Sequence, residues 1–229
     1  MEVSEKGIAA LVAHEGVVPA PYLDSVGVWT VGVGHTAAAG APIPANMRRG
    51  VPNDLDAALR DVFAVFSNDL ERYAADVRRA VKVPMAQHEF DAAVSFHFNT
   101  GAIARASWVK HWNAGNKVAA TKAIMNWTKP MGITQRRRDE RDLFAHGRYP
   151  KGKATVWSVS SSGRVIWKPL RRLSPDDVLG LMRHAPIMPK PPQPDVDPVI
   201  DTTPAKPPQR SLWVVLASLL ASIFGKGKA

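Results

Sequence analysis

A run of prolines near the end of the chain sets the first limit on its fold. Nine of the 19 prolines lie between Pro186 and Pro208. Because proline fixes φ and lacks an N–H donor, this run cannot continue a helix or a central strand. We expect a semi-rigid extended linker, which at ~3.1 Å per residue could span up to roughly 70 Å. A domain boundary near residue 185 follows, and the residues before it must supply the folded core.

An apolar segment, Ser211–Phe224, lies beyond this linker, with Arg210 before it and Lys226 and Lys228 after it. As a helix it would be only ~20 Å long, against ~30 Å of bilayer hydrocarbon. One interpretation is that it packs back on the folded domain or self-associates. The other is that it lies on or inserts into a membrane. Membrane association is favoured because the proline linker separates the apolar segment from any core and because cationic residues flank the segment at both ends.

The chain contains no cysteine, which excludes a disulfide scaffold, a thiolate metal site and a cysteine nucleophile. Its net charge is +10 and its pI about 10.1, and residues 102–172 account for the whole of the excess positive charge. We therefore expect an anionic partner, such as nucleic acid, a membrane surface or an acidic cell-wall polymer. The first residues show no signal-peptide pattern. The expectation is synthesis in the cytoplasm without an N-terminal signal, with release by another route.

Hydrophobic periodicity predicts a mostly helical chain with one strand-rich region near its start. Residues 17–36 alternate as strands do, and residues 154–168 form a second predicted hairpin around a Ser-Ser-Gly turn. The predicted helices cover Ser4–His14, Asp54–Ala80 with Asn53 as its cap, Met85–Phe98, Ala104–Asn113, Lys117–Trp127 and Ile133–Phe144, with a further helix starting at Ser174.

Three residues near the start of the chain form a candidate catalytic set. Glu15 ends the first predicted helix, Asp24 follows in a turn, and Thr30 lies in a predicted strand. Taken singly, they are typical of a solvated helix end, a turn and a strand. A helix end, a turn and a strand can nevertheless meet in one cleft. Two carboxylates and a hydroxyl in one cleft are what glycosidic cleavage needs.

The motif around these residues resembles the catalytic core of the phage-type lysozymes, the endolysins of glycoside hydrolase family 24. It consists of Glu15-Gly16 and then Tyr22-x-Asp24-x-x-Gly27-x-x-Thr30-x-Gly32-x-Gly34-His35-Thr36. Two later motifs are similar to those of the same family: Glu89-Phe90-Asp91-Ala92 leading to Ser95-Phe96-x-Phe98-Asn99-x-Gly101, and Gly132-Ile133-x-x-Arg136-Arg137-x-x-Glu140 followed by Leu143-Phe144. The likeness covers roughly residues 1–150.

The resemblance implies an α+β, lysozyme-like fold that is mostly helical, with a small β-rich lobe and a cleft between the lobes. We therefore expect a catalytic domain over residues 1–150. Residues 151–185 would form a C-terminal extension, a hairpin and a short helix packed on that domain. Residues 186–209 would be the proline-rich linker, and residues 210–229 an apolar, membrane-associated tail helix.

The resemblance also implies an activity, the hydrolysis of the β-1,4 bond between N-acetylmuramic acid and N-acetylglucosamine in peptidoglycan, for bacterial cell-wall lysis. Glu15 would be the general acid that protonates the glycosidic oxygen. Asp24 would orient or activate the attacking water, and Thr30 would hold that water by its hydroxyl. The family favours inversion at the anomeric carbon. No cofactor and no metal are expected, and the catalytic domain is expected to be monomeric.

Further site residues are expected by analogy with the same family. His35 would form a structural ion pair with Asp69, although a direct catalytic role for His35 stays open. Asn99 would line the cleft, whereas Phe98 fits the cleft and the core almost equally well. The candidate substrate contacts are Thr36, Phe98, Asn99, Ser107 and Gly132.

Basic residues cluster at Arg136–Arg138 and Arg141. This run could bind nucleic acid, or an anionic cell-wall polymer or lipopolysaccharide. No nucleic-acid module accompanies it, so the expected partners are peptidoglycan glycan strands, together with an anionic membrane or lipopolysaccharide contacted by the basic block and the tail. Two rival activities stay open, a lytic transglycosylase and a non-catalytic wall-binding or tail-structural module.

Overall fold

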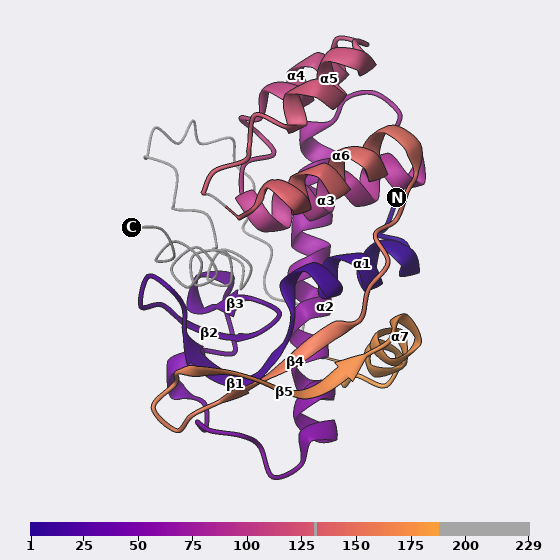
Figure 1. Cartoon of the computed structure of the whole chain (residues 1–229). Helices are drawn as coiled ribbons and strands as arrows, with labels where there is room; N and C mark the ends of the chain where they lie inside the picture. Colours follow the sequence, from indigo (N-terminus) through magenta and orange to yellow (C-terminus); the bar gives the residue numbers. More distant parts are fainter. Residues whose placement is uncertain (131, 188–229) are drawn as a thin grey trace, which may run out of the picture.

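The computed structural model describes residues 1–130 and 132–187. Within them, a small β-rich lobe and a larger helical lobe are joined by one long helix, α2 (Figure 1). This is the α+β, lysozyme-like architecture that the motifs predict. The apolar tail and most of the proline-rich linker lie outside the described residues. In the described part of the chain, no helix is both long enough and apolar enough to cross a membrane.

The first helix, α1 (Glu5–Glu15), ends at the first residue of the candidate catalytic set. Its start is fixed by Ser4, whose hydroxyl accepts a 3.1 Å hydrogen bond from the backbone N–H of Gly7. Its end is fixed by Gly16, which has a φ of +69°. A Cβ built on Gly16 would lie 3.0 Å from the indole nitrogen of Trp157. The helix end and its crowded glycine therefore set the position of Glu15.

The β-rich lobe is an antiparallel sheet of three strands in the order β1 (Val18–Leu23), β2 (Trp29–Gly32) and β3 (His35–Thr36). Thr30 is the Cα partner of Tyr22 on one side and of Thr36 on the other. Two short 3₁₀ turns, Ala37–Ala39 and Pro44–Asn46, follow the sheet. The register places Thr30 at the centre of the sheet.

The long helix α2 (Leu55–Ala80) runs without a break for 26 residues. Its cap is Asp54, whose carboxylate accepts a 2.9 Å hydrogen bond from the N–H of Ala57. The predicted cap at Asn53 is therefore wrong by one residue. Both residue types cap helices equally well, so the sequence alone could not separate them.

The helical lobe contains α3 (Gln87–Thr100), α4 (Ser107–Asn113), α5 (Lys117–Ile124) and α6 (Thr134–His146). Helices α3 and α6 pack side by side, as do α4 and α5 (Figure 1). Its core is aromatic: Trp108 and Trp112 are fully buried, and both form edge-to-face contacts with Phe144. These tryptophans are therefore core residues.

The C-terminal extension consists of β4 (Ala154–Val159), β5 (Val165–Leu173) and α7 (Pro175–Arg183). The hairpin joins the β-rich lobe through Val17, which donates to Thr155 O at 2.9 Å and accepts from Trp157 N at 2.8 Å. Helix α7 packs against α1 and α2. The extension thus packs directly against the segment that carries Glu15.

Candidate active site

Glu15 lies at the end of α1 and is only 2% exposed. Its Oε1 accepts a 2.5 Å hydrogen bond from Nη1 of Arg136, which comes from α6. Its Oε2 is buried and has no hydrogen-bond partner among the described residues. One carboxylate oxygen is therefore fixed by a cation, and the other is available to carry a proton.

Asp24 and Thr30 are positioned by the turn between β1 and β2. Oδ1 of the half-buried Asp24 accepts hydrogen bonds from the N–H groups of Val26 (2.9 Å) and Val28 (2.8 Å). The Thr30 hydroxyl donates to Val28 O at 3.0 Å. Since a hydroxyl has one hydrogen to donate, Thr30 keeps its lone pairs for another donor.

Tyr22 connects the three members of the candidate set. It is buried, and it is the Cα partner of Thr30 in the sheet. Burial raises the pKa of the Tyr22 hydroxyl well above its ordinary value, and the charges of Glu15 and Asp24 raise that pKa further. The charges of both carboxylates therefore reach one buried phenol, and Thr30 lies opposite that residue in the sheet.

Behind Glu15 lies a buried ionic network. Arg136 and Arg137 are 2% and 1% exposed, and Glu140 is 1% exposed. Arg136 Nε donates to Glu140 Oε1 at 2.9 Å, and Arg137 Nη1 donates to Glu140 Oε2. The expectation that this basic run forms an anion-binding surface is therefore wrong for Arg136 and Arg137, because their guanidinium groups are used inside the protein.

The charged side chains of this network shift one another's pKa values. Burial alone lowers the pKa of Arg136, but the charges of Glu15 and Glu140 raise it above its ordinary value. Burial alone raises the pKa of Glu140, but the charges of Arg137 and Arg136 bring it below its ordinary value. Burial lowers the pKa of Arg137 despite the charge of Glu140. The carboxylate of Glu140 is therefore ionised at neutral pH.

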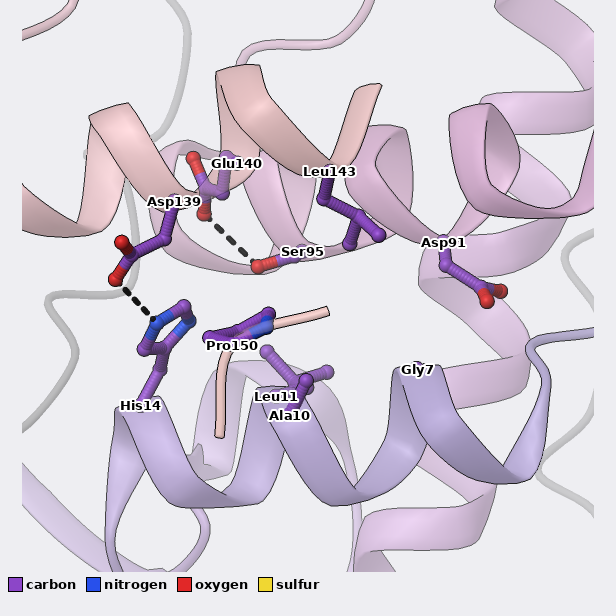
Figure 2. A pocket seen from close by; sticks show the side chains of 10 residues that line it. All are labelled: Gly7, Ala10, Leu11, His14, Asp91, Ser95, Asp139, Glu140, Leu143 and Pro150. Carbon is purple, nitrogen blue, oxygen red and sulfur yellow. Dashed lines mark hydrogen bonds and ion pairs between the residues drawn. The ribbon is translucent and has the colours of Figure 1, made fainter. Parts of the chain in front are cut away.

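Figure 2 shows two contacts that hold α6 against its neighbours on this side of the site. The Ser95 hydroxyl of α3 donates to Glu140 Oε1 at 2.8 Å. His14 of α1, next to Glu15 in the chain, lies 3.2 Å from Asp139 Oδ2 through its Nε2. Helices α1, α3 and α6 are therefore tied together directly behind the candidate acid.

Comparison with known proteins places this arrangement in a family. The family model described as phage lysozyme matches residues 12–140, which is more than half of the chain. The chain belongs to the phage lysozyme family. It is therefore a glycoside hydrolase, a lysozyme that degrades peptidoglycan.

Individual relatives of this lysozyme agree with the family assignment. The endolysin of Salmonella phage P22 is 32% identical over 150 residues, covering 63% of this chain and 98% of the relative. The structure of the endolysin from Escherichia coli O157:H7 phage FAHEc1 is 33% identical, with a TM-score of 0.55, covering 66% of this chain and 98% of that chain. A mutant of P22 lysozyme has a TM-score of 0.52 at 30% identity, over 63% of this chain and 98% of that chain.

The lysozyme holds His35 of β3 and Asp69 of α2 together. His35 Nδ1 lies 2.8 Å from Asp69 Oδ2, and His35 Nε2 lies 2.9 Å from Pro42 O. The second oxygen of Asp69 accepts from Arg72 Nη2 at 2.6 Å. Burial alone lowers the pKa of His35, but the hydrogen bond and charge of Asp69 raise it above its ordinary value. With acceptors at both ring nitrogens, the imidazolium form fits this site.

The candidate substrate contacts divide by their surroundings. Phe98 is 4% exposed and packs against Phe66 and Tyr73, which favours a core role. Asn99 is also buried, and its Oδ1 accepts from Arg137 Nη2 at 2.6 Å. The remaining three candidates are Thr36, which is buried, Ser107, which is half-buried, and Gly132, which is exposed.

Sequence reasoning missed the contact between Glu15 and Arg136. These two residues are 121 positions apart in the chain. No local pattern reports a contact across that distance. The position of both residues in motifs of one family was the available signal.

Proposed function

We propose that this lysozyme hydrolyses the β-1,4 bond between N-acetylmuramic acid and N-acetylglucosamine, with Glu15 as general acid and with Asp24 and Thr30 acting on the attacking water. The observation that carries the proposal is that Thr30 pairs with the buried Tyr22 in the sheet, while the charges of both Glu15 and Asp24 raise the pKa of the Tyr22 hydroxyl. An inverting glycosidase needs an acid on one side of the bond and a carboxylate that activates water on the other.

The surroundings of Glu15 suit a group that gives up a proton. Its carboxyl group is buried, and Arg136 donates a hydrogen bond to one of its two oxygens. Once the proton has moved to the leaving oxygen, Arg136 stabilises the carboxylate that remains. The unpartnered Oε2 is the oxygen that would hold the proton before transfer.

The surroundings of Asp24 and Thr30 suit the water side of the reaction. Two backbone N–H groups fix Oδ1 of Asp24, which leaves Oδ2 to accept a hydrogen bond from water. Thr30 donates its own hydrogen to Val28 O, so its oxygen accepts from the same water. Two acceptors orient the water's hydrogens and leave an oxygen lone pair for attack on the anomeric carbon.

Identification of the products by mass tests the reaction type. Wild type and the Thr30→Ala variant are incubated with purified peptidoglycan, and the released muropeptides are analysed. Hydrolysis gives reducing-end muropeptides from wild type, and Thr30→Ala gives them much more slowly. Anhydro products formed equally well by both proteins would mean a lytic transglycosylase, and no products would mean a non-catalytic wall-binding module.

We also propose, from the sequence, that residues 210–229 attach the enzyme to an anionic membrane or lipopolysaccharide, with the exposed part of the basic block assisting. Apolar residues flanked by cations favour anionic lipid surfaces.

Two further parts of the account remain proposals. The proposed substrate contacts are Thr36, Asn99, Ser107 and Gly132. The proposed boundaries between the parts of the chain lie near residues 150, 185 and 209.

A further inference from the structure

Glu140 has no part in the chemistry proposed above, yet it is as deeply buried as Glu15. Its Oε1 accepts from Ser95 Oγ at 2.8 Å and from Arg136 Nε at 2.9 Å. Its Oε2 accepts from Arg137 Nη1. Three donors from two helices therefore fix this carboxylate in place.

The guanidinium of Arg136 lies between two carboxylates. Nη1 donates to Glu15 at 2.5 Å, and Nε donates to Glu140 at 2.9 Å. We propose that Glu140 is a positioning residue that shares the charge of Arg136 and thereby allows Glu15 to keep the proton it transfers. This inference rests on the proposed role of Glu15 as general acid.

The physical argument concerns which protonation state of Glu15 the network favours. A buried arginine bound to one carboxylate alone would hold that carboxylate ionised, because opposite charges attract strongly where water is excluded. A second carboxylate on the same guanidinium offsets part of this attraction, and it also repels the negative form of Glu15. Glu140 itself stays ionised, because Arg137 binds its other oxygen.

Several other charged or titratable groups lie near Glu15 in the chain or act on the same residues, and the substitution Glu140→Gln leaves each of them chemically unchanged. Tyr22 comes from β1, Tyr73 from α2, and Asp24 from the turn after β1. His14 of α1 is held by Asp139 of α6. Arg137 interacts with Glu15 at longer range. The substitution Glu140→Gln therefore alters one charge next to Arg136 and keeps the side chain's size.

The test is the pH dependence of the initial rate on purified peptidoglycan at substrate concentrations far below saturation. The rate falls with rising pH as Glu15 loses its proton in the free enzyme. This fall in rate is the alkaline limb of the pH profile. In Glu140→Gln we expect the alkaline limb to move toward acid by about one pH unit or more. At a pH where the rate is already falling, the rate of the variant would then be about tenfold lower than that of wild type. A lower rate with an unmoved limb would show a merely structural role and overturn the proposal.

Three control variants separate charge from packing. Ser95→Ala removes a hydrogen bond to Glu140 but keeps its charge, so its limb should stay close to that of wild type. Glu140→Asp keeps the charge and should restore most of the wild-type limb. Glu71→Gln removes an exposed carboxylate on α2 that pairs with Arg78, and its limb should coincide with wild type. A limb in Glu71→Gln that moves as far as in Glu140→Gln would contradict the specific role of Glu140.

A second variant covers the case in which Glu140→Gln does not fold. The double variant Arg137→Gln/Glu140→Gln removes one cation and one anion, and it leaves Arg136 paired with Glu15. Its alkaline limb should move in the same direction by a smaller amount, and an unmoved limb would overturn the proposal. Activity in Glu15→Gln would refute the general-acid role itself, whereas an inactive Glu15→Gln with no limb shift in the Glu140 variants refutes only this inference.

Discussion

The two carboxylates of the site are held in opposite ways. Glu15 is almost fully buried and is fixed by an arginine 121 residues away in the chain. Asp24 is half-buried, and the contacts that fix it are backbone N–H groups two and four residues away. The acid side of the site therefore depends on long-range packing between helices, and the water side depends on one local turn.

This difference predicts that loss of the buried cation on the acid side destabilises the protein more than any change in the turn. Arg136→Met removes the cation between two buried carboxylates, and breaking a buried ion pair costs about 3–5 kcal/mol. We expect a loss of this size in the free energy of unfolding, measured by urea denaturation. Arg138→Met, an exposed neighbour on α6, is the control and should change stability by less than about 0.5 kcal/mol. Equal effects would contradict the buried network.

The water side should lose activity without losing stability. Asp24→Asn keeps an oxygen that can accept from Val26 and Val28, so unfolding should change by less than about 1 kcal/mol. The amide cannot take the proton from water, and the rate on peptidoglycan should fall about 10²–10⁴-fold. A variant that retains wild-type activity would remove Asp24 from the mechanism.

The His35–Asp69 pair is a structural counterpart to these two sites, and its contribution should depend on pH. Because the folded-state pKa of His35 is raised, its stabilisation is fully present below the unfolded value of about 6.5 and is lost as pH rises through the folded value. A double-mutant cycle with His35→Asn and Asp69→Asn, measured by thermal unfolding, should give a coupling of about 0.5–3 kcal/mol at pH 5 and less at pH 9. No coupling at pH 5 would refute the pair.

Removal of the C-terminal linker and tail is expected to have the smallest effect on the rate of hydrolysis. Deletion of residues 186–229 should leave the rate on purified peptidoglycan unchanged within about twofold, because the residues of the proposed site all precede it. The same deletion should weaken binding to vesicles with anionic lipid, measured by co-sedimentation. Equal vesicle binding by the full chain and the truncated chain would refute the membrane role of the tail.

The parts of the site that the sequence could predict are those fixed by local contacts, and the parts that it could not predict depend on distant contacts. The end of α1 at Glu15, the turn at Asp24 and the strand at Thr30 were predicted, because caps, turn residues and alternation act within a few residues. The burial of Arg136 and Arg137 was not predicted. A run of arginines is normally solvated, and only the folded structure reveals the carboxylate partners that make burial tolerable.

The core residues follow the same division between local patterns and distant contacts. Trp108 and Trp112 recur at helical spacing, and they are buried against Phe144. Phe98 could not be assigned, since an apolar ring in a cleft motif suits either a cleft or a core. Its contacts with Phe66 and Tyr73 come from α2, which is distant in sequence.

The initial rate of Glu15→Gln on purified peptidoglycan, beside wild type and Glu71→Gln, tests the central claim most directly. In Glu15→Gln, Arg136 keeps its partner Glu140, so the variant should remain folded by circular dichroism. The account predicts a rate at least about 10²-fold below wild type for Glu15→Gln and a wild-type rate for Glu71→Gln. A folded Glu15→Gln enzyme with a rate within tenfold of wild type would contradict the assignment of Glu15 as the general acid.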